Sequence, residues 1–328
     1  MKYCIDVSFI FIARKMDNKR IVYIDIARAL AMLYIIGFWQ LKDYLSPDLK
    51  ETVTFKGSND ITNIMLGVFM FISGTLLSKY RFEKIKDITY FLIKRIKRFY
   101  ILYFITALLF YISGLIPNIK ILTTTILGVS TYILPQPYTL WFISMLFSFY
   151  LITPFVGLLS KKYSIDIIYI GLLFYVLLII LNTQLSPIDK RIYYCFPAYF
   201  MGIKMGIKGV DKVFSVALLI YYIILYVLFI YLRYKGVSVH YLDLFCGIFI
   251  FISICKLLAR TLNKRVLHIF YFLSYASMCM YLFHRLIYDY IKCHLADCFS
   301  IPLALFALLI VFILSFAIQK SYDYLRKY

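Results

Sequence analysis

Two arginines near position 100 are spaced so that they could hold a phosphate group together. Arg95 and Arg98 lie three residues apart in a segment that also carries Lys94 and Lys97. Residues at positions i and i+3 share one face of a helix, so both guanidinium groups would point the same way. A guanidinium group binds phosphate through two parallel hydrogen bonds, which lysine does less well. The pair therefore indicates a ligand with phosphate groups, although cations at the inner end of a membrane span would also explain the segment.

Other polar residues interrupt apolar segments, where ionisable groups are costly and become candidates for function. Asp25 and Arg28 are one helical turn apart and could act in chemistry or simply neutralise each other. Ser73 and Gly74 adjoin in a second segment, where small residues also serve ordinary helix packing. His284 could act as a base near neutral pH, or be a buried histidine with satisfied partners.

These residues have to be positioned by membrane-spanning helices. Hydrophobic residues make up 63% of the 328 positions, and they form segments of about 18 to 25 residues, the length that crosses a bilayer. The segments are continuous rather than alternating, which excludes the strands of a β-barrel. The predicted fold is an all-α polytopic membrane helical bundle. Its apolar segments are 21–41, 61–78, 97–114, 119–134, 140–159, 165–182, 192–207, 213–232, 241–258, 268–288 and 301–319.

Charge predicts which connections face the cytoplasm, because cytoplasmic loops carry an excess of Lys and Arg. The connection 79–98 has eight basic and two acidic residues, whereas 42–60 and 183–191 are balanced or poor in charge. Basic and poor connections alternate along the chain if segment 119–134 does not cross. We therefore expect about ten transmembrane helices with both termini in the cytoplasm. The net charge of +20 then reflects this bias and contact with anionic membrane lipids, and not nucleic-acid binding.

Several classes of site are missing from the sequence. No nucleotide-binding glycine loop, zinc-protease motif or serine-hydrolase motif is present, and no metal site is expected. Cys293 and Cys298 share one outer loop and could be bridged, but isolated cysteines commonly act as small apolar residues. Residues 1–19 are expected to be a short cytoplasmic extension in which Met16 could be the true start, and residues 20–328 the transmembrane domain.

Five motifs occur in an order that resembles the acyltransferase 3 family, bacterial inner-membrane proteins with about ten spans. The resemblance covers the chain from about residue 20 to its end. The motifs are Asp25-Ile-Ala-Arg28, Phe71-Ile-Ser73-Gly74, Arg95-Ile-Lys-Arg98, Leu140-Trp141-Phe-Ile-Ser144 with Phe149 to Pro154, and Leu273 to Ser277 with Tyr281-Leu-Phe-His284.

The resemblance implies a multi-pass inner-membrane enzyme that moves an acyl group, usually acetyl, from cytoplasmic acetyl-CoA to a sugar hydroxyl. The acceptor would be a surface polysaccharide or exopolysaccharide, or its lipid-linked glycan precursor. By the resemblance, Arg95 and Arg98 match the arginine pair that would bind the phosphates of coenzyme A. Arg28 matches the first-span arginine, and Ser73 with Gly74 matches the Ser-Gly motif of the second span.

One position departs from the family. A histidine is expected eleven or twelve residues after the first-span arginine, where this chain has Trp39 and Gln40. An amide can orient a hydroxyl but cannot take its proton near neutral pH. His284 could serve as the base instead, the proton could leave to water, or the chain could have lost activity. The alternative to an enzyme is a degenerate member or a glycan or lipid translocation component.

A possible acceptor groove is also visible in the sequence. The outer segment 115–139 and Trp141 carry aromatic rings on which sugar faces could stack, although an aromatic belt at the membrane interface explains such rings equally well.

Overall fold

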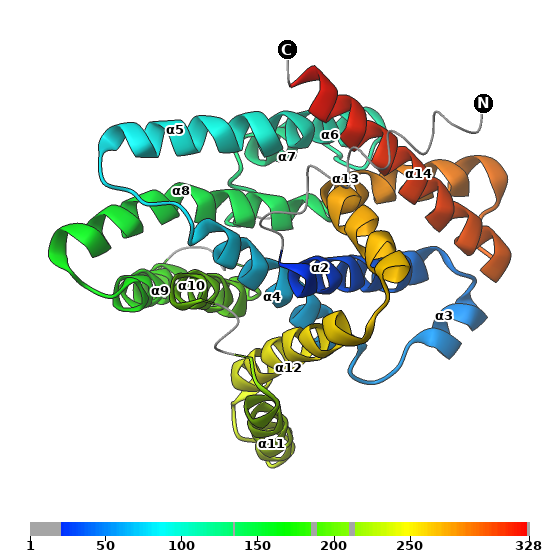
Figure 1. The fold of residues 1–328 in the computed structure, drawn as a ribbon. Helices are drawn as coiled ribbons and strands as arrows, with labels where there is room; N and C mark the ends of the chain where they lie inside the picture. Colours follow the sequence, from blue (N-terminus) through cyan, green and yellow to red (C-terminus); the bar gives the residue numbers. More distant parts are fainter. Residues whose placement is uncertain (1–20, 134, 185–188, 210–213, 327–328) are drawn as a thin grey trace.

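The computed structural model describes residues 21–133, 135–184, 189–209 and 214–326. Within these ranges the chain is helical, and its one β-type pairing is an isolated bridge between Leu45 and Phe299. The all-α prediction is therefore confirmed for the described residues (Figure 1). The predicted extension 1–19 lies outside them.

The chain order of the helices fixes the architecture. They are α2 (Val22–Tyr34), π-helical η1 (Ile35–Gln40), 3-10 helical η2 (Leu41–Tyr44), α3 (Pro47–Val53), α4 (Ser58–Leu77), α5 (Ile85–Arg95), π-helical η3 (Ile96–Tyr100), α6 (Ile101–Ile112), α7 (Ile119–Ile126), α8 (Leu140–Tyr163), α9 (Ile167–Gln184), α10 (Ile192–Lys208), α11 (Val216–Tyr234), α12 (His240–Thr261), α13 (Lys264–Leu295) and α14 (Ile301–Leu325).

Seven helices in the described ranges are long and apolar enough to cross a membrane, against ten predicted spans. They are the continuous stretch Val22–Tyr44, then α4, α8, α11, α12, α13 and α14. The other three predicted spans are helices of shorter apolar length. The apolar part of α9 is Ile167–Leu181, α10 has 17 residues, and α6 has 12 after a π-helical turn. The number of spans and the side on which the termini lie stay predictions.

The segment predicted not to cross is short. Within 119–134 the described helix is α7, whose eight residues extend about 12 Å. A hydrocarbon core is about 30 Å thick, so α7 is too short to span it. Its N-terminus is fixed by the Asn118 side chain, which accepts a hydrogen bond from the Ile121 N–H at 2.9 Å.

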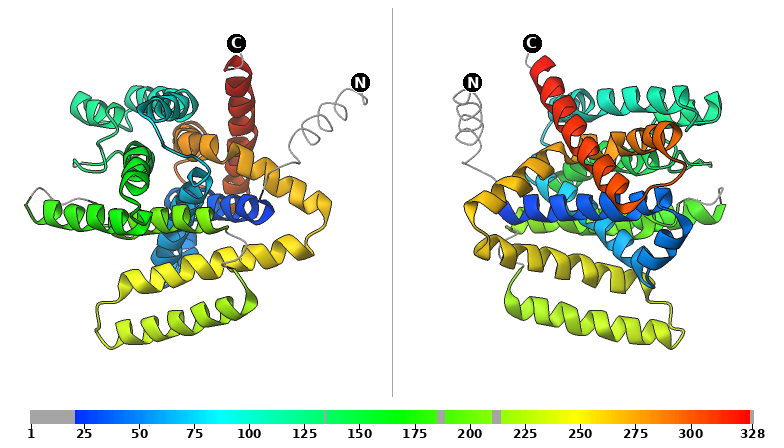
Figure 2. Two further views of the ribbon diagram at one scale, coloured as in Figure 1. Left: turned by 60° about the vertical axis from the view of Figure 1, so that its left-hand side comes forward. Right: turned by 90° about the vertical axis from the view of Figure 1, so that its right-hand side faces the viewer.

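Contacts join the connections that charge placed on the poorer side. Arg233 at the end of α11 pairs with Asp60 at the start of α4 (2.7 Å) and with Asp243 at the start of α12 (2.8 Å). The backbone N–H of Phe299 donates to the Tyr44 carbonyl at 2.7 Å, joining the loops before α3 and before α14. These ends therefore lie on one side of the bundle. Figure 2 shows α11 running beside α12 at its periphery.

The basic connections meet one another in the same way. Lys161 at the end of α8 forms an ion pair with Glu83 in the loop before α5. The hydroxyl of Tyr322 near the end of α14 donates to the Lys97 carbonyl. Basic connections thus contact basic connections, which is the grouping that alternating spans predict.

Helices α4 and α10 pack with their backbones in contact. A Cβ atom at Gly74 would lie 2.0 Å from the Tyr199 carbonyl oxygen, and one at Gly202 would lie 2.1 Å from the Phe71 carbonyl oxygen. A Cβ atom at Gly206 would meet Ser78 Oγ at 2.2 Å. Glycines four residues apart allow such close approach in membrane helices. This seam holds α4 in place, and with it the face that carries Ser73.

We expect Gly74→Ala to destabilise the folded protein by about 1 to 3 kcal/mol or more, because the added methyl group meets a backbone carbonyl that cannot rotate away. The thermal unfolding midpoint in detergent measures the loss. Ser73→Ala is the matched control, since it lies one residue away on the side of the cavity described below and should unfold like the wild type. Equal midpoints for both variants would contradict the role of the seam.

Candidate functional site

A cavity of about 540 Å³ lies between α2, α4, the α5–η3 junction, α8, α13 and α14. Ligand pockets in proteins commonly have volumes of this order. Arg28, Ser73, Arg95 and Arg98 all line it, although they come from three separate regions of the sequence. The other polar side chains in its wall are Asp25, Lys79, Tyr80, Tyr100, Tyr103, Tyr150, Ser274, Tyr275, Ser277, Tyr281, Gln319 and Asp323.

Arg95 is held by aromatic rings rather than by an acid. Its side chain is 9% exposed, and its Cζ atom lies 5.2 Å from the ring centres of Phe91 and Tyr150 and 5.3 Å from that of Tyr80. Cation–π contacts of this kind stabilise a guanidinium without neutralising its charge. The buried Nε has no hydrogen-bond partner. Arg95 therefore keeps an uncompensated positive charge at the cavity.

Arg98 stands beside Arg95 and adds a second charge. It is exposed at the cavity wall, with its Cζ atom 5.3 Å from the ring centre of Phe99. Among the described residues, no carboxylate lies within ion-pair distance of either arginine. Two like charges without an acid partner are an arrangement suited to an anionic ligand such as phosphate.

Local sequence explains how this arginine pair is presented. The Asp87 carboxylate accepts hydrogen bonds from the N–H groups of Glu83 and Lys84, both at 2.9 Å, and so fixes the start of α5. These bonds lower the pKa of the Asp87 carboxyl. Arg95 ends α5 and Arg98 follows in the π-helical turn η3, a distortion that often occurs at functional sites.

The acidic residues of the cavity are engaged by hydroxyl groups. Ser274 donates to Asp25 Oδ1 at 2.6 Å, and Tyr275 donates to Asp323 Oδ2 at 2.7 Å. Arg28 lies on the same wall as Asp25, one turn further along α2. The predicted closeness of Asp25 and Arg28 thus becomes part of a larger polar wall that includes α13.

The sequence-predicted residue Gly74 has a different position from its neighbour Ser73. Ser73 lines the cavity, whereas Gly74 faces α10 in the glycine seam and is absent from the cavity wall. Contact of Gly74 with a coenzyme is therefore not supported by the geometry. Consecutive helical residues point about 100° apart, so one residue of a Ser-Gly pair can face a ligand while the other packs.

His284 lies outside the cavity wall and is fully buried. Its Nδ1 is 2.9 Å from the Tyr281 carbonyl oxygen and 3.1 Å from that of Met280. Because both partners are acceptors, the hydrogen-bond network assigns the proton to Nδ1 and leaves a lone pair on Nε2. Nε2 has no partner. The ring of Tyr281, which does line the cavity, is 5.9 Å from the His284 ring.

Gln40 is also outside the cavity, at the far end of η1. Its Oε1 accepts a hydrogen bond from Arg285 Nη1 at 3.1 Å. The guanidinium of Arg285 lies 4.0 Å from the ring centre of Tyr138. Gln40 therefore fixes Arg285 between α2 and α13. The expectation that Gln40 and His284 would share one connected path with the arginine pair is not matched by this wall, in which neither residue takes part.

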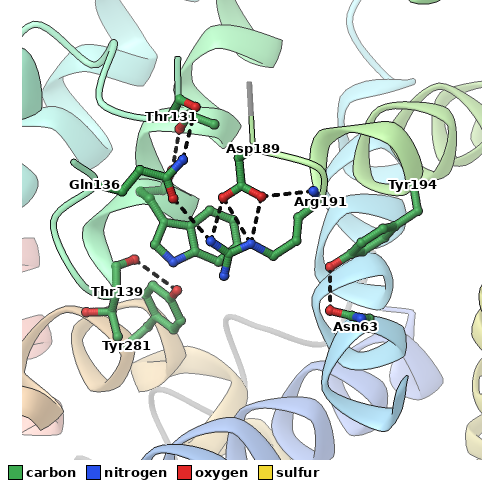
Figure 3. Close-up of polar contacts among 9 residues, drawn as sticks. Asn63, Thr131, Gln136, Thr139, Asp189, Arg191, Tyr194 and Tyr281 are labelled. Carbon is green, nitrogen blue, oxygen red and sulfur yellow. Dashed lines mark hydrogen bonds and ion pairs between the residues drawn. The ribbon is translucent and has the colours of Figure 1, made fainter. Parts of the chain in front are cut away.

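The outer loops are joined by a second polar cluster (Figure 3). The guanidinium of Arg191 lies 3.4 Å from the ring centre of Trp141, pairs with Asp189, and donates to Gln136 Oε1 at 3.1 Å. Trp141 is 7% exposed. Its ring is covered by Arg191, which disfavours the idea that it serves as a platform for a sugar.

Sequence reasoning missed several lining residues. Gln319 and Asp323 are polar residues four positions apart near the end of the last apolar segment, a pattern that could have placed them on one inward face. The tyrosines around Arg95 carry no such signal, because tyrosine is abundant throughout the chain. The described residues contain no group of three His, Cys, Asp or Glu that could hold a metal ion, and Cys293 and Cys298 are free and exposed.

Apolar helices around a cationic cavity define a multi-pass membrane protein with a ligand site. The chain belongs to the acyltransferase 3 family, because the family model described as an acyltransferase domain matches residues 21–320. No curated protein and no solved structure matches the chain. The resemblance drawn from the five motifs is thereby confirmed, and the protein is a membrane protein of an acyltransferase family.

Proposed function

We propose that the protein is an O-acetyltransferase of the bacterial inner membrane. It would transfer an acetyl group from cytoplasmic acetyl-CoA to a sugar hydroxyl of a surface polysaccharide or of its lipid-linked precursor. The observation that carries this proposal is the placing of Arg95 and Arg98, without acid partners, in one cavity with Arg28 and Ser73. A polyphosphate ligand would supply the negative charge that this cavity lacks.

The residues at the cavity have distinct roles in this proposal. When bound, acetyl-CoA supplies an activated thioester. Arg95 and Arg98 bind its phosphates through charge-assisted hydrogen bonds. Arg28 and Ser73, on neighbouring helices, are the donors available to polarise or orient the acyl carbonyl.

His284 is the proposed general base. Its Nε2 lone pair would take the proton of the acceptor hydroxyl as the hydroxyl oxygen attacks the thioester carbonyl. The carbon–sulfur bond then breaks, and the thiolate of coenzyme A leaves. Gln40 acts indirectly, because its amide accepts no proton and instead holds Arg285 beside His284.

Purified protein in lipid nanodiscs provides the test. Binding of radiolabelled acetyl-CoA, release of free thiol, and transfer of label to glycan extracted from the host envelope are measured in parallel. We expect saturable binding and glycan-dependent thiol release. Absence of saturable acetyl-CoA binding would overturn the proposal, whereas binding without transfer would favour a degenerate family member.

A further inference from the structure

A second cavity, of about 320 Å³, adjoins the first. The two cavities share the side chains of Leu77 and Tyr80 as a common wall. The second cavity lies between the loop that follows α4, the C-terminal half of α8, and α10. Its cationic residues are Arg81 and Lys161. It is therefore on the same side of the bundle as the basic connections.

The walls of this cavity combine three kinds of surface. Leu77, Ile203 and Ile207 form an apolar part, and Phe82 with Tyr80 forms an aromatic part. Phe82 can lie against α8 because residue 157 is glycine, where a Cβ atom would be 2.7 Å from the Phe82 ring. Arg81 and Lys161 supply positive charge. An apolar and aromatic pocket beside two cations suits a nucleoside that carries a phosphate.

Glu83 modulates the charge at this cavity. It forms an ion pair with Lys161, and both it and Lys161 line the cavity. The hydrogen bond from Lys161 and its positive charge lower the pKa of the Glu83 carboxyl, so Glu83 is ionised at neutral pH. A phosphate in this cavity would therefore compete with Glu83 for Lys161, while Arg81 makes no ion pair among the described residues.

We propose that the second cavity binds the adenosine 3′-phosphate end of the acyl-CoA donor. This inference rests on the proposed function. Coenzyme A carries two separate phosphate groups, a diphosphate and a 3′-phosphate on the ribose. The structure has two separate sets of cations, Arg95 with Arg98 in the first cavity and Arg81 with Lys161 in the second. Tyr80 stands between them and also contacts Arg95.

The test compares acetyl-CoA with 3′-dephospho-acetyl-CoA, which lacks only the ribose phosphate. Dissociation constants are measured with the full-length protein in phosphatidylcholine nanodiscs. We expect the wild type to bind acetyl-CoA about tenfold or more tightly than the dephospho form, since charge-assisted hydrogen bonds to the phosphate are lost. Arg81→Ala and Lys161→Ala should each reduce this ratio without weakening binding of the dephospho form.

Two further variants make the assignment specific. Lys162→Ala removes the same charge from the adjacent residue, which does not line the cavity, and should keep the wild-type ratio. Glu83→Gln frees Lys161 from its ion pair and should increase the ratio. This gain of binding cannot arise from a misfolded protein.

The possible outcomes separate the two proposals. If both ligands bind the wild type equally, the second cavity does not hold the 3′-phosphate and this inference is wrong, although the proposed function stands. If neither ligand binds, the proposed function fails and this inference fails with it. If phosphatidylglycerol in the nanodisc abolishes the ratio in the wild type, the cavity binds a lipid headgroup instead, which also overturns the inference.

Discussion

Replacing Arg95 and Arg98 together by alanine should weaken acetyl-CoA binding by about a hundredfold or more. Each guanidinium is expected to make charge-assisted hydrogen bonds to phosphate, worth about 1.5 to 3 kcal/mol each, and every 1.4 kcal/mol is about a tenfold change in affinity. No carboxylate of the described chain competes for these groups. Equilibrium binding of radiolabelled acetyl-CoA measures the change directly.

The matched control is Lys97→Ala. Lys97 lies between the two arginines on the same helical turn, is exposed, and does not line the cavity. Its loss removes a positive charge from the same face of the membrane and should leave acetyl-CoA affinity within about twofold, as expected for a surface charge. A similar loss of binding in Lys97→Ala and in the double variant would mean that general positive charge, and not the arginine pair, attracts the donor.

Replacing His284 by glutamine should lower acetyl transfer by about 10² to 10⁴-fold, the usual contribution of a general base. Acetyl-CoA binding should stay unchanged, because His284 is outside the cavity wall. Glutamine approximates the size of histidine and can keep a hydrogen bond to the backbone, but its amide cannot take a proton. Rates of label transfer to envelope glycan, measured with saturating acetyl-CoA, test this expectation.

His294→Gln is the control for that variant. His294 is on the same helix, and its Nδ1 also contacts a backbone carbonyl one turn earlier, that of Tyr290 at 2.9 Å. It is exposed and distant in sequence from the cavity-lining residues of α13. Transfer by His294→Gln should match the wild type. Undiminished transfer by His284→Gln would show that the proton leaves by another route, such as water.

The sequence was sufficient to predict the fold class and the arginine site for physical reasons. A backbone in lipid has to be helical when its apolar segments are continuous, so composition and segment length determine the class. Arg95 and Arg98 needed only their spacing, because local helix geometry brings them to one face. Arg28 and Ser73 lie on separate helices, and their presence in the same cavity depends on packing that periodicity does not describe.

The position of the proposed base could not be read from the sequence. His284 and Gln40 are 244 residues apart, and their relation depends on Arg285, whose side chain bonds Gln40. Whether the imidazole faces the cavity or the interior depends on the rotation of α13 against α2. Likewise, Ser73 and Gly74 were assigned one role, but the close approach of α10 gives the glycine to packing and leaves the serine at the cavity.

The glycine seam between α4 and α10 limits how the protein can change shape. Carbonyl oxygens of Phe71 and Tyr199 occupy the space of absent Cβ atoms on the opposite helix. Sliding one helix along the other would drive these oxygens into neighbouring side chains, so the two helices have to move as one body. Transporters of the alternating-access type rock one helical bundle against another. Any such motion here would have to leave this pair undivided, with Ser73 as a fixed point of the donor site.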